Sequence, residues 1–221
     1  MTISVHSKTL DSLNYSFFKK KEQSEVYSSI EYLLKRVVDL SVSLLLLIIS
    51  LPIILYSIYR IRKESKGPIL FKQNRVGLKG KIFSCYKFRS MHTDNTYFNL
   101  YTQDNDTRIF PYGNIMRKYR IDELPQILNI LKGEMHLVGP RAEWDILVNT
   151  YNDKIDNYEK RHLVKPGITG LAQVSYPYGR NTADARKKLK YDLLYIHNWS
   201  PILELKVVWK TILVVLGKKG V

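Results

Sequence analysis

The chain has 221 residues, with 35 lysines and arginines against 20 aspartates and glutamates, which gives a formal net charge of +15. A hydrophobic share of 45% excludes a disordered chain, and a single cysteine excludes a disulfide scaffold or a thiolate metal cluster. The positive charge predicts an anionic partner, either nucleic acid, an acidic membrane surface or a phosphorylated substrate. Composition does not choose among these three, so the choice depends on the order of the residues.

The N-terminal part of the chain divides into a polar segment and an apolar one. Residues 1–30 are polar and are expected to form an extension. From Leu40 to Tyr59 the chain carries no charge, and about 20 residues is the length of a helix that spans a bilayer core. The sequence therefore predicts a membrane-embedded helix within residues 31–66.

The residues alone leave two topologies open for this helix. Basic residues flank it on both sides, so neither flank identifies the cytoplasmic side; they are Lys35, Arg36, Arg60, Arg62 and Lys63. Pro52 cannot donate to a backbone carbonyl and is expected to kink the helix, and the Ser50 hydroxyl could satisfy a freed backbone group. A re-entrant helix that returns to the same face explains both features. A spanning helix with a tolerated kink is the alternative.

Residues 67–221 have the pattern of a small α+β domain. Two strands are expected, at residues 69–73 and 81–88, joined by a turn at 77–80. Helices are expected at residues 127–131, 143–161 and 183–197, and from Pro201 onward. Pro166, Gly167 and Gly170 indicate a loop.

The last helix has a broad apolar face. Pro201 suits its first turn, and Ser200 suits its N-cap. Charged residues interrupt the helix too often for a membrane span, so we expect an amphipathic helix lying on the membrane surface, with a soluble core helix as the alternative. The apolar face consists of Ile202, Leu205, Val208, Trp209, Ile212 and Leu216.

Asp122 and Glu123 form the strongest candidate for chemistry. They stand just before Pro125, which marks the first turn of a helix, where unpaired N–H groups favour anions. Two adjacent carboxylates can bind Mg²⁺ together with phosphate, and one of them can act as a nucleophile. The ordinary alternative is that both simply balance the helix dipole.

Basic residues suited to phosphate recognition are Arg75, Lys87, Arg89 and Arg141. A cationic cluster near two carboxylates is what phosphoryl transfer with a metal requires. The segment Asp104-Asn105-Asp106 could be a metal motif or a turn. The sequence contains no Gly-rich nucleotide loop and no nucleic-acid-binding module, so we expect no nucleic-acid partner.

Six segments, in this order, resemble the bacterial sugar transferase family, in particular the monotopic polyprenyl-phosphate phosphoglycosyl transferases in their short form. They are KRVVDL, GPILFKQNRVGLKGKIF, YKFRSM, DNDTRI, RKYRIDELPQILNILKGEMHLVGPR and KPGITGLAQV. The resemblance implies transfer of a sugar-1-phosphate from a UDP-sugar to undecaprenyl phosphate, with release of UMP, as the first step of capsule, exopolysaccharide, O-antigen or glycoconjugate assembly. It also implies a re-entrant helix in membrane lipid and a catalytic domain on the cytoplasmic face of the bacterial inner membrane.

The resemblance assigns roles residue by residue. Asp122 is the expected nucleophile and Glu123 the expected Mg²⁺ ligand, and Lys87 and Asp192 are expected in the catalytic site. The expected substrate contacts are Arg75, Arg89 and Arg141. The chain departs from the family pattern at His136 and Ala142, where a serine and a proline are frequent. A homodimer stays open, and an inactive membrane-tethered scaffold of the same fold is the alternative function.

Overall fold

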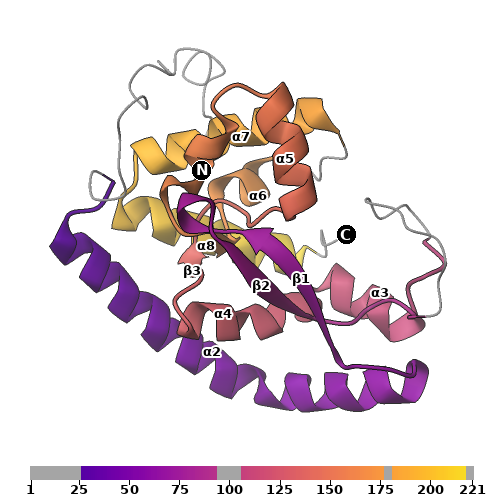
Figure 1. Cartoon of the computed structure of the whole chain (residues 1–221). Helices are drawn as coiled ribbons and strands as arrows, with labels where there is room; N and C mark the ends of the chain where they lie inside the picture. The colour runs from indigo at the N-terminus through magenta and orange to yellow at the C-terminus, as the bar shows by residue number, and fades with distance from the viewer. Residues whose placement is uncertain (1–25, 94–105, 177–180, 218–221) are drawn as a thin grey trace.

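The computed structural model describes residues 26–93, 106–176 and 181–217, which form a long N-terminal helix and a mixed α+β body (Figure 1). The long helix, α2 (Ser29–Glu64), has 36 residues. It begins at a capping box, in which the Ser28 hydroxyl accepts from the Glu31 N–H and the Glu31 carboxylate accepts from the Ser28 N–H. Most of the predicted polar extension, residues 1–25, lies outside the described residues.

Helix α2 continues through Pro52 and changes direction part-way along its length (Figure 1). The Ser50 hydroxyl donates to the Leu47 carbonyl at 3.4 Å, and not to the Ile48 carbonyl that Pro52 leaves free. The helix is long and apolar enough to cross a membrane, and 17% of its most apolar window is buried in the protein. A core helix of a soluble protein would be mostly buried, so this exposure supports the predicted membrane association.

The buried face of α2 is polar except at Ile61. Its buried residues are Lys35, Asp39, Ser43, Ser50, Ser57 and Ile61. Large apolar side chains such as Leu33, Ile48 and Leu55 are exposed on the rest of the helix. A helix of a soluble protein has the opposite arrangement, with its apolar face towards the core. The sequence of α2 therefore fits a helix that presents apolar side chains to lipid and polar side chains to its own domain.

Strands β1 (Leu70–Val76) and β2 (Ile82–Phe88) form an antiparallel hairpin, in register from Leu70 opposite Phe88 to Val76 opposite Ile82. The connecting turn, η3 (Leu78–Gly80), has Lys79 at φ 53° and Gly80 at φ 75°. Glycine adopts such positive φ values without a steric penalty. The predicted hairpin is confirmed.

The chain then forms α3 (Pro111–Lys118), the 3₁₀ turn η4 (Ile121–Gln126) and α4 (Ile127–Leu131). Strand β3 (His136–Val138) pairs in parallel with β4 (Gly167–Thr169). The sequence predicted a loop at β4 and did not predict α3. These short elements depend on contacts with distant parts of the chain, which local periodicity does not report.

The remaining elements are α5 (Asp145–Lys154), η5 (Tyr158–Leu163), α6 (Leu171–Ser175), α7 (Thr182–His197) and α8 (Pro201–Leu216). The prediction of one helix over residues 143–161 was wrong, because α5 ends at Lys154, where Ile155 is extended, and the left-handed Asn157 (φ 63°) then precedes a separate 3₁₀ turn. Buried residues of α5, η5 and α7 form the main core, among them Val148, Tyr158, Leu193 and Tyr195.

Helix α8 begins at Pro201, as predicted, and the Ser200 hydroxyl accepts from the Leu203 N–H at 3.2 Å. Leu205 and Leu216 are 70% and 71% exposed, and Trp209 is 62% exposed. The exposed apolar face supports the expected interfacial helix and argues against a soluble core helix, whose apolar face would be covered.

Candidate active site

The carboxylates of Asp122 and Glu123 lie on the turn η4, between the hairpin and α4. The turn starts at Arg120, whose left-handed backbone (φ 57°) reverses the chain after α3, and the Glu123 N–H then donates to the Arg120 carbonyl at 3.2 Å. Glu123 is buried, at 5% exposure. The predicted position at the start of a helix is therefore correct, but the first turn is 3₁₀ and α4 begins at Ile127.

Three cations surround the Glu123 carboxylate. Lys87 Nζ lies 2.8 Å and an Arg141 nitrogen 3.2 Å from Oε1, whereas Arg120 lies 3.7 Å from Oε2. Burial raises the pKa of Glu123, but the charges of Lys87, Arg141 and Arg120 outweigh that effect and hold the pKa well below its usual range. Glu123 is therefore ionised at neutral pH.

Asp122 has the opposite shift. Burial raises its pKa above the usual value, the neighbouring Glu123 charge raises it further, and Lys87, Arg117 and Arg120 partly offset the two. A carboxylate with a raised pKa is a stronger nucleophile once it has lost its proton. The nearby cations can stabilise negative charge on a substrate. The pair thus combines Glu123, whose pKa is lowered, with Asp122, whose pKa is raised.

Lys87 is held in position by the packing of β2 against α4. The Asn129 side chain, which is fully buried in α4, accepts from the Tyr86 N–H at 3.1 Å and donates to the Ser84 carbonyl and to Glu134, both at 2.7 Å. These bonds fix the strand that carries Lys87 relative to the helix that follows Glu123. Sequence reasoning missed Asn129, because the two strand residues that it bonds lie 43 and 45 residues earlier in the chain.

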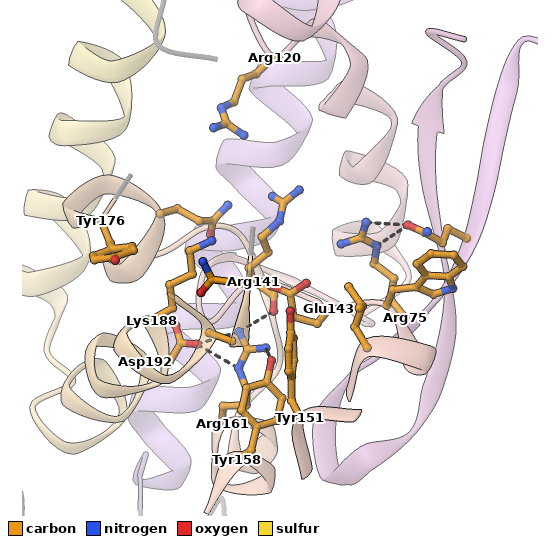
Figure 2. A pocket seen from close by; sticks show the side chains of 16 residues that line it. Arg75, Arg120, Arg141, Glu143, Tyr151, Tyr158, Arg161, Tyr176, Lys188 and Asp192 are labelled. Atoms are coloured by element: carbon orange, nitrogen blue, oxygen red, sulfur yellow. Dashed lines mark hydrogen bonds and ion pairs between the residues drawn. The ribbon is translucent and has the colours of Figure 1, made fainter. Parts of the chain in front are cut away.

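A pocket lies beside the carboxylate pair, and Arg120 and Arg141, which contact Glu123, form part of its lining. Figure 2 shows the labelled side chains of the pocket. Its walls carry more positive than negative charge, and its aromatic residues supply flat apolar surfaces. The lining cations are Arg75, Arg120, Arg141, Arg161 and Lys188, the carboxylates are Glu143 and Asp192, and the aromatic residues are Trp144, Tyr151, Tyr158 and Tyr176. Such a lining suits a ligand with a negatively charged part and a planar ring.

Asp192 lies in this pocket, paired with a buried arginine. Its Oδ2 accepts from Arg161 Nε at 3.0 Å and from Nη2 at 2.7 Å, and the two side chains are 2% and 4% exposed. Burial raises the pKa of Asp192, and Arg161 opposes this shift. Arg161 also donates to the Tyr158 hydroxyl at 2.7 Å and to the Arg141 carbonyl at 2.9 Å. The pair thus supports the backbone at Arg141, and a catalytic role of Asp192 stays a prediction.

The two other predicted arginines lie in different surroundings. Arg75 lines the pocket, where it donates to Gln73 Oε1 and to the Ala142 carbonyl. Arg89 is 5% exposed and donates to the Ser65 hydroxyl and to the backbone carbonyls of residues 65, 66 and 68. Its guanidinium therefore holds the chain that leaves α2, and its substrate contact stays a prediction.

The donor set has two carboxylates suited to a hard cation. The Glu123 Oε2 atom is the oxygen farther from the surrounding cations, and Mg²⁺ is commonly held by one or two carboxylates together with substrate phosphates. Within residues 26–93, 106–176 and 181–217, no group of three or more histidine, cysteine, aspartate and glutamate side chains could hold a metal. Asp104 and Asn105 lie outside these residues, and Asp106 pairs with Arg108.

Several residues of the site were not predicted from the sequence, chiefly Arg120, Glu143, Arg161 and Lys188. Arg161 gave no signal, because its carboxylate partner Asp192 lies 31 residues later in the chain. Arg120 lies only three residues before its partner Glu123 and was overlooked despite that spacing. Burial lowers the pKa of Lys188, and the positive charges of Arg141 and Arg161 add to this shift while Glu143 and Asp192 oppose it. The site is therefore a denser charge network than its motifs indicate.

Comparison with known proteins identifies the family. A family model described as bacterial sugar transferase matches residues 30–218. The chain belongs to the bacterial sugar transferase family. The predicted resemblance is thus confirmed, and the match covers both α2 and the domain that carries the carboxylate pair.

Named relatives of this bacterial sugar transferase include long and short chains. It is 40% identical, over 87% of its length, to a UDP-N-acetylgalactosamine-undecaprenyl-phosphate N-acetylgalactosaminephosphotransferase of Aeromonas hydrophila, of which it covers 46%. It is 42% identical, over 86% of its length, to the uncharacterized sugar transferase EpsL of Bacillus subtilis, of which it covers 90%. A UDP-glucose:undecaprenyl-phosphate glucose-1-phosphate transferase of Klebsiella pneumoniae is 40% identical over 84% of this chain and is covered to 40%. The chain thus spans less than half the length of two of these relatives.

Proposed function

We propose that this sugar transferase moves a sugar-1-phosphate from a UDP-sugar to undecaprenyl phosphate, releases UMP, and so starts the assembly of a capsule, exopolysaccharide, O-antigen or other glycoconjugate. The observation that carries the proposal is the pair Asp122-Glu123 among Lys87, Arg120 and Arg141, at the edge of a cationic and aromatic pocket. The names of the relatives, which act on undecaprenyl phosphate, support the acceptor.

The chemistry proceeds in two displacements. A carboxylate oxygen of Asp122 forms a bond to the β-phosphorus of the donor, the bond from that phosphorus to the bridging oxygen breaks, and UMP leaves with the electron pair. A phosphate oxygen of the acceptor then bonds to the same phosphorus, and the bond to Asp122 breaks to restore the carboxylate. Two bulky substrates of different solubility can thus use one site in turn.

The charged residues divide the remaining tasks. Arg141 and Arg120 stand between the carboxylate pair and the pocket, which suits them to the donor's diphosphate. Lys87 keeps Glu123 ionised and lowers the pKa of Asp122, so that more of the nucleophile is deprotonated at neutral pH. Glu123, with Asp122, would hold Mg²⁺, which offsets negative charge on the diphosphate when bound.

The proposed test is UMP release by detergent-solubilised protein with undecaprenyl phosphate, Mg²⁺ and one UDP-sugar at a time. We expect UMP with one donor, and its loss with EDTA and in Asp122→Asn, while that variant stays in the membrane fraction. Turnover that persists in Asp122→Asn would refute the nucleophile. An absence of UMP across a broad panel of donors would favour the inactive scaffold.

The proposed topology is a re-entrant α2 in the bacterial inner membrane, with the catalytic domain on the cytoplasmic face. The basic residues at both ends of α2 and its change of direction at mid-length support it. Single cysteines in place of Ser29 and Lys66, both exposed at opposite ends of α2, test it, because the native Cys85 is buried. Neither cysteine should react with an impermeant maleimide in spheroplasts until the membrane is opened. Labelling of one end alone would indicate a spanning helix.

A further inference from the structure

A buried polar bridge joins α2 to the strand that leads into the active site. Asp39 of α2 is 1% exposed, and its Oδ2 lies 2.5 Å from Nδ1 of the fully buried His136 on β3. Its second oxygen accepts from the Leu137 N–H at 3.3 Å. One carboxylate of the membrane helix thus holds both the first side chain and the second backbone amide of β3.

The histidine of this bridge donates to Asp39. Burial lowers the pKa of His136 and Lys35 adds to the shift, whereas the hydrogen bond to Asp39 opposes it. A neutral ring with its proton on Nδ1 fits these surroundings, and Nε2 has no hydrogen-bond partner among the described residues. The hydrogen bond that the ring makes within the described structure is therefore directed at α2.

A second contact, one turn earlier on α2, reaches the other end of β3. Lys35 Nζ lies 2.5 Å from Glu204 of α8 and 3.4 Å from the Val138 carbonyl. The Tyr195 hydroxyl of α7 lies 2.7 Å from the same Glu204 oxygen and 3.0 Å from the same Val138 carbonyl. The last residue of β3 is thus the point where the membrane helix, the core helix α7 and the interfacial helix α8 meet.

Strand β3 has little freedom to move independently of the active site. Arg141 follows it by three residues, and its guanidinium binds Glu123 at 3.2 Å. The intervening backbone packs without space, since the Gly139 N–H donates to the Thr169 carbonyl and a Cβ on Gly139 would lie 2.7 Å from the Lys165 carbonyl oxygen. A shift of β3 must therefore displace Arg141 as well.

We propose that Asp39 and His136 are positioning residues for the transfer reaction: they fasten β3 to the membrane helix and thereby hold Arg141 in the geometry that receives the donor phosphates. This inference rests on the proposed function, and it adds that the seating of α2 in the membrane is coupled to donor binding. Three contacts, two from Asp39 and one from Lys35, carry that coupling to both ends of a three-residue strand.

The test compares Asp39→Asn with the matched control Ser43→Ala. Ser43 lies one turn further on the same buried face of α2, is fully buried, and has no hydrogen-bond partner within the described residues. Asp39→Asn should raise the donor KM on the order of tenfold, with a smaller change in kcat, whereas Ser43→Ala should leave both within about twofold. Equal KM values in the two variants would overturn the proposal.

A double-mutant cycle separates positioning from general loss of stability. If Asp39 acts through Arg141, Asp39→Asn should add little to the donor KM of Arg141→Lys, because the arginine that it positions is already gone. If the two substitutions acted independently, their fold-changes in donor KM would multiply in the double variant, and this result would contradict the proposal. His136→Asn, which keeps a donor near the position of Nδ1, should retain a donor KM closer to the wild type than His136→Leu does.

Hydrogen exchange supplies a readout that does not depend on turnover. In the full-length protein in detergent, the amides of Leu137, Val138, Gly139 and Arg141 should exchange faster in Asp39→Asn than in Ser43→Ala and the wild type. Unchanged exchange there would overturn the inference while leaving the proposed function intact. If the wild type transferred no sugar phosphate but Asp39→Asn still exchanged faster than the wild type, the proposed function would be refuted, and the coupling of α2 to the strand before Arg141 would stand.

Discussion

The buried pair of Arg161 and Asp192 gives the sharpest prediction about stability. Asp192→Ala leaves the guanidinium, 4% exposed, without its carboxylate. Removal of one partner from a buried ion pair costs roughly 3–5 kcal/mol. The lower end applies here, because Arg161 keeps the Tyr158 hydroxyl and the Arg141 carbonyl as acceptors. At about 2–4 °C per kcal/mol for a chain of this size, the melting temperature should fall by roughly 6–12 °C.

The assay is thermal unfolding in detergent, followed by tryptophan fluorescence. The double variant Arg161→Met with Asp192→Leu removes both charges and should recover most of the loss, because apolar residues of similar volume often replace a buried ion pair at little cost. A fall of less than about 2 °C in Asp192→Ala would refute the reasoning. Abolished UMP release at an unchanged melting temperature would instead identify Asp192 as a catalytic residue.

Three further predictions concern the charges and the packing around the dyad. Lys87→Met should move the acid limb of the rate profile, measured as kcat/KM against pH, to higher pH, because Lys87 lowers the pKa of Asp122 and the proposed nucleophile must be ionised; an unmoved limb would contradict this. Glu123 has a lowered pKa when folded, so its stabilisation is present above the pKa of the unfolded chain and is lost in acid. Glu123→Gln should therefore reduce the melting temperature most at neutral pH. A loss of melting temperature, relative to the wild type, that grows in acid would contradict the lowered pKa of Glu123. Gly167→Ala places a Cβ 2.1 Å from the Gly139 nitrogen and should cost at least about 1–3 kcal/mol in unfolding free energy, whereas an unchanged melting temperature would contradict the packing.

The sequence predicted those elements whose cause is local. The uncharged run from Leu40 to Tyr59 predicts α2, and the glycines at 77 and 80 between two short strands predict the β1–β2 hairpin. Strand β4 was predicted as a loop, because three residues carry no periodicity and their partner strand ends 29 residues earlier. The break between Lys154 and Tyr158 was missed, because an extended Ile155 and a left-handed Asn157 inside a mixed-charge run leave no pattern.

The candidate site was predicted in part for the same reason. The motifs identified Asp122, Glu123, Lys87 and Arg141, which the fold brings together. The polar contacts between α2 and the domain were missed, since Lys35 was recognised only as a flanking charge of the membrane segment. Its actual contacts, with Glu204 and the Val138 carbonyl, lie more than 100 residues away in the chain. Such contacts follow from tertiary structure, which neither spacing nor composition reports.

The most direct test of the account is the intact mass of the protein after incubation with its UDP-sugar donor and Mg²⁺ in the absence of undecaprenyl phosphate. The account predicts an added mass equal to one sugar phosphate on Asp122, release of one UMP per protein, and loss of the adduct when the acceptor is supplied. Asp122→Asn should show neither the adduct nor the UMP. An active enzyme that releases UMP only when the acceptor is present, and never carries the adduct, would contradict the covalent mechanism.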